Sequence, residues 1–417
     1  MFKKILSLVL ALALTLSVSL ALASCGKTNE DLLGMSESPL PAPAITSTVT
    51  IPESFKIGFI CLHDENSTYD LNFIEAAVAV QEALGLSNSQ VIIKKNIEEG
   101  EACAVAARDL VEQGCSVIFA NSFGHEDYVL QVAKDFPNVQ FCHATGYKAA
   151  LNPDVTNYQN AFANIFEGRY LAGIAAGMKL NEMIAAGEFT AEEAKIGYVG
   201  AFTYAEVVSG YTSFYLGAKS VCPTVTMDVQ FTGSWFDPTE ENNAAKALLA
   251  RGCKLISQHA DSMGAPSACE DAGVPNVSYN GSTYEACPET FIVSSRINWA
   301  PYFLYIIECA VKGEEIATDW CGGIEEGSVV LTGINLDVAA EGTVEAIKNA
   351  IAEIKAGTLK VFNCANFTVQ EGSLEAFNAD AMVKTENGVT YYAESSAASA
   401  PSFSYQIEGI TRVNEKF

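Results

Sequence analysis

Short apolar runs alternate with amphipathic stretches along the chain from Phe55 onward. The apolar runs are rich in β-branched and aromatic residues, a pattern that predicts buried strands. The predicted strands are Lys56–Leu62, Val91–Lys95, Ser116–Asn121, Val139–His143, Lys195–Gly200, Val225–Phe231, Lys254–His259, Val277–Asn280, Thr290–Ser294 and Val329–Ile334.

Between these runs, apolar positions recur with the period of an α-helix. The predicted helices are Asp70–Leu84, Ala102–Gln113, Tyr128–Phe136, Ala163–Leu180, Val207–Lys219, Pro238–Arg251 and Trp299–Lys312. The helix after Asp237 has a capping Asp, Pro238 at its first position, Glu240 at its third, and Gly252 after its last turn. Alternation of strands and helices predicts an α/β fold with parallel sheets covered by helices on both faces.

The chain repeats itself. Three segments recur in the same order 138 or 139 residues later: Lys56–Ile60 as Lys195–Val199, Gly114-Cys115 as Gly252-Cys253, and Pro137–Val139 as Pro275–Val277. Such a repeat predicts two similar α/β lobes. We assign 53–163 with about 296–335 to the first lobe, and 164–295 with about 336–417 to the second.

Two doubly wound lobes joined by crossing segments leave a cleft between them, and ligands bind such sheets at the carboxyl ends of their strands. The segments expected at the cleft are Cys61–Asp70, Asn121–Gly124, His143–Tyr147, Ala201–Glu206, Gly233–Phe236, His259–Met263 and Tyr279–Gly281. They are rich in aromatic rings, which stack on flat ligands, and in carboxylates, which accept hydrogen bonds from N–H groups or sugar hydroxyls. For any one aromatic residue, filling the edge of a lobe is an equally good interpretation.

The charge balance narrows the class of partner. The 417 residues hold 24 Lys and Arg against 50 Asp and Glu, a net charge of −26, which argues against binding a nucleic-acid polymer. None of the 12 cysteines forms a CxxC pair, so a zinc site is not expected, and most cysteines fit buried apolar positions. One or two disulfides remain an alternative.

The N-terminus predicts export. Lys3 and Lys4 precede an apolar run from Ile5 to Ala23, as in a secretory signal, although an uncleaved membrane anchor would have a similar run. The small residues before Cys25 resemble a bacterial lipobox, in which that cysteine is lipidated and becomes the new N-terminus. We therefore predict a signal peptide over 1–24, a lipid on Cys25, and a flexible tether over 25–52.

Catalytic motifs are missing from the sequence: it has no G-x-S-x-G elbow, no H-E-x-x-H and no Walker loop. His63 with Asp64, or His259 with Asp261, could serve as acid–base pairs, and Cys61 beside His63 could suggest a nucleophile. Hydrogen bonding to a ligand, or packing in the core, is the favoured interpretation of the two His–Asp pairs, and no third group that would orient a Cys61 nucleophile is identifiable. We predict no enzyme activity, no cofactor and no metal, and a cleft hydrolase is the least favoured alternative.

Several segments resemble the basic membrane protein (Bmp) family of substrate-binding lipoproteins, whose best known members bind purine nucleosides. The most specific are Asp64 with Asp70-x-x-Phe73, Glu167–Gly173 and Gln258–Ser262; others are Gly146–Lys148, Gly197–Gly200 and Asn298–Tyr302. The resemblance implies two Rossmann-like lobes with a ligand cleft, the type I periplasmic-binding-protein fold. It also implies that Phe73 and Trp235 clamp a ring while Asp64 and Asp261 accept hydrogen bonds.

Trp235–Pro238 and Gln258–Ser262 look closer to a branch of the family associated with a free purine base such as adenine. Ile74 stands where the nucleoside binders have Asn after the stacking Phe, which weakens the expectation of a ribose contact because a buried unpaired hydroxyl is costly. Strand ends and resemblance together give these candidate ligand-binding residues: Asp64, Tyr69, Asp70, Phe73, Ser122, Phe123, Tyr147, Tyr204, Glu206, Trp235, His259, Asp261, Asn280 and Trp299.

The resemblance implies a lipid-anchored solute-binding protein on the extracytoplasmic face of the cell membrane, touching the membrane only through its lipid. It would close on a small purine ligand and deliver it to an ABC transporter permease. The alternative is a surface lipoprotein that acts as an adhesin, sensor or immunogen without a transport role.

Overall fold

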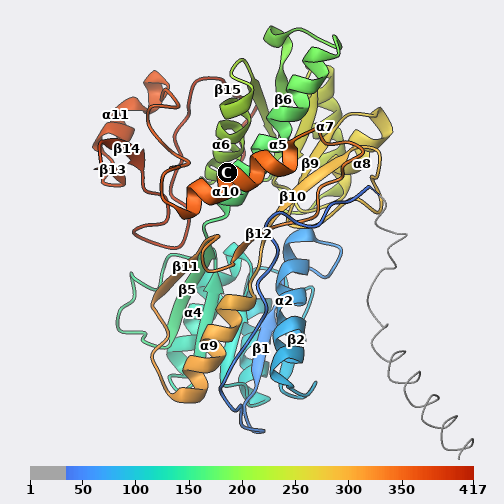
Figure 1. The fold of residues 1–417 in the computed structure, drawn as a ribbon. Coiled ribbons are helices and arrows are strands. Elements are labelled where there is room, and N and C mark those ends of the chain that lie inside the picture. Colours follow the sequence, from blue (N-terminus) through green and yellow to red (C-terminus); the bar gives the residue numbers. More distant parts are fainter. Residues whose placement is uncertain (1–33) are drawn as a thin grey trace, which may run out of the picture.

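The computed structural model describes residues 34–417, which form two α/β lobes (Figure 1). The predicted signal peptide and Cys25 lie outside the described residues. Within 34–417, no helix combines the length and apolar character needed to cross a membrane.

The first lobe is built on a six-stranded sheet in the order β11-β5-β4-β3-β1-β2 with parallel pairings throughout. Its strands are β1 (Ile57–Ile60), β2 (Val91–Lys94), β3 (Val117–Ala120), β4 (Gln140–Ala144), β5 (Tyr158–Ala163) and β11 (Asp319–Gly322). Its helices are α2 (Thr68–Leu84), α3 (Glu101–Glu112), α4 (Glu126–Asp135) and α9 (Ala300–Lys312). Successive residues of β1 point to opposite faces, so Phe59 packs with the apolar side chains of α2 and α9 while Ile60 packs with those of α3 and α4.

The second lobe is built on a seven-stranded sheet in the order β12-β10-β9-β8-β6-β7-β15, in which only β12 runs antiparallel to its neighbour. Its strands are β6 (Lys195–Gly200), β7 (Thr226–Phe231), β8 (Leu255–Gln258), β9 (Asn276–Tyr279), β10 (Phe291–Ile297), β12 (Val329–Leu331) and β15 (Ile410–Arg412). Its helices are α5 (Ile165–Ala185), α6 (Ala205–Val221), α7 (Pro238–Ala250), α8 (Gly264–Ala272) and α10 (Thr343–Lys355). A short helix α11 (Glu371–Ala379) and a hairpin of β13 (Val383–Glu386) and β14 (Val389–Tyr392) lie beside this lobe (Figure 1).

The internal repeat falls on equivalent elements of the two sheets. Strand β1 corresponds to β6, and the turns before β3 and β4 correspond to those before β8 and β9. Gly114 and Gly252 both adopt a positive φ, at 85° and 89°, where the helix ends and turns into the next strand. The predicted α/β fold with two lobes is therefore confirmed.

Every strand and helix predicted above is present, with ends shifted by a few residues. The helix start at Asp237 is confirmed: the Asp237 side chain accepts hydrogen bonds from the backbone N–H groups of Thr239 and Glu240, both at 3.0 Å. Strand β5 escaped the prediction because its buried residues include Gln159 and Asn160, which interrupt the apolar pattern. The helix expected from Ala163 consequently begins after that strand ends.

Two details of the predicted organisation differ from the structure. Strand β12 falls within 296–335, which we assigned to the first lobe, but it pairs with β10 of the second sheet. In addition, the described part of the predicted tether, 34–52, is attached to the body rather than free. Ser36 N–H donates to the Ile334 carbonyl at 2.8 Å, Leu331 N–H donates to that of Leu40 at 3.0 Å, and Leu40 is buried.

The cysteines of the described chain are unpaired. Most of them are buried, and only Cys321 and Cys364 are half-buried. The expectation that they act as small apolar residues agrees with this burial.

Candidate ligand-binding site

A cavity of about 390 Å³ lies between the lobes. Its lining comes from both lobes and from the C-terminal segment: Leu62, His63, Tyr69, Asp70, Ser122, Phe123, Thr145, Tyr147, Thr203, Tyr204, Ala205, Glu206, Trp235, His259, Asp261, Ala400 and Pro401. Nearly all of these residues follow the carboxyl ends of β1, β3, β4, β6, β7 and β8. The topology therefore assembles the cavity where doubly wound sheets bind ligands.

Aromatic rings form one part of the wall. Tyr204 stacks on Phe202 with ring centroids 5.1 Å apart and planes inclined by 10°, and the Trp235 ring meets Phe202 edge-on at 5.0 Å. Phe123 reaches across from the first lobe to within 5.6 Å of Tyr204. Phe123 and Tyr147 remain 41% and 46% exposed, so they lie toward the mouth of the cavity. Such a wall suits a ligand with flat faces.

Behind the wall, a buried arginine supports a histidine and a carboxylate. Arg169 donates to Nδ1 of His259 at 3.0 Å and to the Gln258 carbonyl at 3.0 Å. Because Nδ1 accepts, the ring proton lies on Nε2, which is 3.0 Å from Oε1 of Glu206. Burial lowers the pKa of His259, so the imidazole is neutral and links the guanidinium to the Glu206 carboxylate at the cavity wall.

Asp261 has the most perturbed carboxyl of the cavity. Burial, helped by the nearby carboxylates of Asp70, Glu241 and Glu206, raises its pKa well above the ordinary value. A protonated carboxyl both donates and accepts a hydrogen bond. Glu206 and Asp261 thus place two carboxyl groups in one cavity, and the raised pKa of Asp261 favours its protonated form.

Asp70 has the opposite environment. Its Oδ1 accepts from the His63 backbone N–H at 3.1 Å and from Nδ2 of Asn121 at 2.7 Å, and His63 Nδ1 lies 3.4 Å from Oδ2. Burial opposes ionisation, but hydrogen bonds from His63, Asn121 and Ser67 outweigh it and lower the pKa of Asp70. Asp70 is therefore ionised, and its hydrogen bonds to His63 and Asn121 stabilise the loop after β1.

Most of the predicted ligand-binding residues line the cavity: Tyr69, Asp70, Ser122, Phe123, Tyr147, Tyr204, Glu206, Trp235, His259 and Asp261. Their side chains are thus brought together, as strand ends in two parallel sheets predict. Their contact with a ligand stays a prediction.

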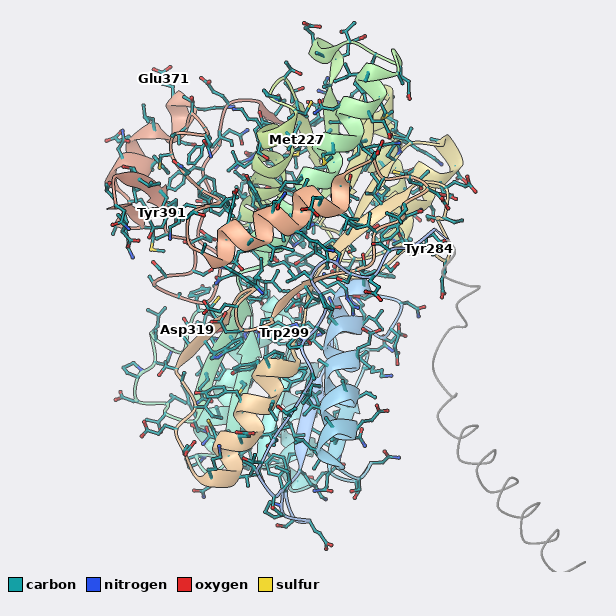
Figure 2. All side chains as sticks on the ribbon, in the orientation of Figure 1. Met227, Tyr284, Trp299, Asp319, Glu371 and Tyr391 are labelled. Carbon is teal, nitrogen blue, oxygen red and sulfur yellow. The ribbon has the colours of Figure 1, made fainter. Side chains whose placement is uncertain are left out.

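Four predicted residues lie elsewhere. Phe73 and Trp299 are core residues, 1% exposed each, and stack on each other with centroids 4.5 Å apart; Figure 2 labels Trp299 on the first lobe, near its border with the second. Asn280 accepts a hydrogen bond from Asn72 at 2.9 Å. Asp64 accepts from the backbone and side chain of Asn66 and so shapes its own loop.

Phe73 therefore does not line the cavity in this structure, and its contact with a ligand stays a prediction. The helical period of α2 turns Phe73 toward the sheet, where Phe119 also packs on it at 5.7 Å.

The cavity also contains residues that are not among the predicted ligand-binding residues, although His63 was considered for an acid–base pair: Leu62, His63, Thr145, Thr203, Ala205, Ala400 and Pro401. The first five fall inside the predicted cleft segments, so strand ends gave a usable signal for them. Ala400 and Pro401 lie far along the chain in a stretch without periodicity, and nothing in the sequence places them here.

The lobes are in contact across the cavity. Thr68 N–H, at the start of α2, donates to the Asp261 carbonyl at 3.0 Å, and the His63 ring lies 5.3 Å from that of Phe236. These contacts join the first lobe to loops of the second. The two lobes thus meet across the cavity.

Comparison with known proteins identifies the family. The family of ABC transporter substrate-binding proteins described as PnrA-like, named Bmp, matches residues 60–362, most of the chain. The chain belongs to the Bmp family. Its members are substrate-binding proteins rather than enzymes, and such a protein works with an ABC transporter permease.

Among individual relatives of this Bmp-family chain, a purine-binding protein of Brucella abortus is 33% identical over 316 residues, covering 74% of this chain and 83% of the relative. A putative ABC transporter glucose-binding protein of Haloferax volcanii is 34% identical over 263 residues, covering 62% and 63%. An ABC transporter nucleoside-binding protein of Lactococcus lactis is 27% identical over 154 residues, covering 37% and 39%.

Solved structures agree on the fold. A solute-binding protein of Aeropyrum pernix superimposes with a TM-score of 0.62 at 16% identity, covering 78% of this chain and 98% of its own. One from Conexibacter woesei gives 0.58 at 20% identity, covering 73% and 98%. At these identities the likeness supports the two-lobed fold of solute-binding proteins and nothing finer.

A role for Cys61 as a nucleophile does not fit the surroundings of its side chain. The side chain is buried, and burial together with the nearby Asp70 raises the pKa of the thiol well above its ordinary value. A thiol held protonated is a poor nucleophile. This environment agrees with membership of a non-enzymatic family.

Proposed function

We propose that this Bmp-family chain binds a purine base or purine nucleoside in the cavity between its lobes and delivers it to the permease of an ABC importer. The observation that carries the proposal is the lining. Aromatic faces from Tyr204 and Trp235 stand beside the carboxyl groups of Glu206 and Asp261. A purine has flat faces for the first and ring-edge donors and acceptors for the second.

Charge limits the ligand further. In the described chain the lining includes carboxyl groups from Asp70, Glu206 and Asp261 but no Lys or Arg. A phosphate group would face these carboxyls without a cation to neutralise it, which disfavours nucleotides. An uncharged ligand rich in N–H donors fits the cavity better.

A sugar is the competing ligand, because one relative is named a putative glucose-binding protein. Carboxylates accept from sugar hydroxyls as readily as from N–H groups. The extent of the aromatic wall favours the purine, since it offers faces on which a flat ring can stack. An adhesin or immunogen would have no need of such a cavity, whereas a small-molecule sensor would share it.

Thermal-shift screening followed by calorimetry tests the ligand. We expect purines or their nucleosides to raise the melting temperature, and sugars and amino acids to leave it unchanged. Trp235→Ala should weaken binding by about 30-fold, a typical loss for a buried aromatic contact, whereas Trp235→Phe keeps an aromatic face and should lose far less. A shift with sugars and none with any purine would refute the ligand assignment.

We also propose that the protein is held on the extracytoplasmic face of the membrane by a lipid on Cys25, after removal of residues 1–24. The basic residues, apolar run and small residues before Cys25 support this. Cys25→Ser should move the protein from the membrane fraction to the supernatant of cell fractions. Retention of the variant in the membrane would favour the uncleaved anchor.

A further inference from the structure

The C-terminal part of the chain goes beyond the family match. The match ends at residue 362, yet the chain continues through α11, the β13–β14 hairpin and β15, which extends the second sheet beside β7. In Figure 1 this part lies beside the second lobe and returns to it. This addition to the matched region is therefore joined to the second sheet through β15.

A loop of this addition reaches the cavity. Ala400 and Pro401 line it, and both are half-buried. Neither side chain can form a hydrogen bond, and Pro401 has no backbone N–H to donate. The loop thus supplies a small apolar surface at one part of a cavity that aromatic and acidic side chains also line.

The base of the loop is fastened to the second lobe. The Glu394 carboxylate accepts from the backbone N–H of Ser402 at 2.8 Å and of Phe403 at 3.0 Å, and it also hydrogen-bonds the side chain of Ser209 on α6. The Phe403 ring stacks on Phe362 with centroids 4.6 Å apart. Residues 394–403 therefore form a closed loop with a rigid base.

The tip of the loop is fastened to the first lobe. Ser399 is buried, and its backbone N–H donates to Oδ1 of Asp319 on β11 at 3.0 Å. The Cys321 thiol, on the same strand, lies 3.9 Å from the Ser399 carbonyl. Figure 2 labels Asp319 on the first lobe near the border between the lobes, so the loop bridges them beside the cavity.

We propose that residues 394–403 form a strap that closes one end of the cavity, and that Ala400 and Pro401 determine the size of the ligand there. This inference rests on the proposed function only for the identity of the ligand. Because the strap is fastened to both lobes, its contact with Asp319 depends on closure. The strap then slows ligand release, and its short apolar wall limits how far a ligand can extend.

Paired substitutions at Asp319 test the fastening. Asp319→Ala removes the acceptor for the Ser399 N–H and should speed ligand dissociation about tenfold, the usual effect of losing a hydrogen bond to a charged group. Asp319→Asn keeps an acceptor oxygen and should stay near the wild-type rate. Equal dissociation rates in wild type and both variants, measured by stopped-flow fluorescence, would overturn the strap.

Substitutions at Ala400 test the size limit. Ala400→Leu shortens the cavity, so affinity for a purine nucleoside should fall about tenfold further than affinity for the smaller free base. Ala400→Gly is the matched control and should leave the ratio of the two affinities unchanged. An unchanged ratio in the Leu variant would contradict the size role, and the Asp319 pair keeps the strap testable if that variant fails to fold.

The outcome is separable from the ligand assignment. If a sugar but no purine raises the melting temperature of the wild type, the proposed ligand is wrong. The strap can still be tested, because the dissociation rates of the two Asp319 variants can then be measured with that sugar. With saturating ligand, faster amide exchange over 395–402 in the Asp319→Ala variant than in the Asp319→Asn variant would support the strap. Equal exchange in the two would count against it.

Discussion

Arg169 does not line the cavity, but it positions a carboxylate that does, Glu206, through His259. Arg169 fixes the proton of the imidazole on the side of Glu206, and the neutral ring passes that orientation on. The arginine also lies over the Tyr279 ring, with the guanidinium carbon 3.2 Å from the ring centroid. The geometry of the cavity carboxylate therefore depends on side chains behind it.

Phe73 gives the sharpest test at the scale of single residues. It is fully buried and packs against Tyr69, Phe119 and Trp299. Phe73→Ala should lower the free energy of unfolding by about 3–5 kcal/mol, measured by urea denaturation, because it leaves a cavity in the core. Phe123→Ala is the control: this exposed cavity residue should weaken ligand binding and leave stability nearly unchanged.

The sequence predicted cavity residues where a position just after a strand end determines where the side chain lies. Trp235, His259 and Asp261 follow strand ends, and strand ends of parallel sheets converge. Phe73 and Trp299 are aromatic residues near the same ends, but the helical turn that places them inward is a matter of packing. Type and spacing alone do not separate a ring that stacks on a ligand from one that stacks on its neighbour.

At the scale of elements, helices α5 and α6 pack unusually closely. A Cβ atom added at Gly217 would lie 2.0 Å from the Tyr170 carbonyl oxygen, and one added at Gly173 would lie 2.0 Å from that of Phe214. Each glycine thus lets the backbone of the facing helix approach. Since the cavity residues Ala205 and Glu206 are the first residues of α6 and Tyr204 is its N-cap, this contact also positions the site.

Gly217→Ala should therefore destabilise the protein by about 1–3 kcal/mol, because the helices must separate to admit the methyl group. The control is Gly372→Ala in α11, where a Cβ would meet nothing within 4 Å. That substitution should be neutral or stabilise slightly, since Ala favours helix. Chemical denaturation compares the two, and equal effects would contradict the close packing.

At the scale of the molecule, polar contacts join the two lobes. Asn72 on α2 donates to Oδ1 of Asn280 at 2.9 Å and accepts from Nε and Nη2 of Arg296 at 3.0 and 2.8 Å. Both partners belong to the second lobe. Arg296 also pairs with Glu75 of α2, so the contact joins a helix of one lobe to the sheet of the other.

Asn72→Ala should favour the open form. These groups regain water when the lobes separate, so the loss falls mainly on the closed form, and ligand dissociation should quicken about tenfold. Asn88→Ala is the matched control, because Asn88 bonds only to Gln81 of its own lobe among the contacts observed. Stopped-flow dissociation and small-angle scattering of the ligand-free protein measure the change, and an unaltered dissociation rate would contradict it.

The two-lobed plan was predictable because a repeat in sequence reports a repeat in structure. The strap and the attachment of residues 34–52 were not. Both are non-periodic segments held by isolated contacts, such as Ser399 with Asp319 and Ser36 with Ile334, between residues far apart in the chain. No local pattern encodes such pairings.

The unpaired cysteines make this protein suitable for site-specific labelling with fluorescent dyes. Among the described cysteines, all but Cys321 and Cys364 are fully buried, and burial raises the pKa of thiols such as Cys103 and Cys142 to about 12. Such thiols react slowly with maleimides, which attack the thiolate. A single cysteine introduced on each lobe's surface would therefore take up dyes selectively, and the two dyes would report opening and closing as a fluorescence signal.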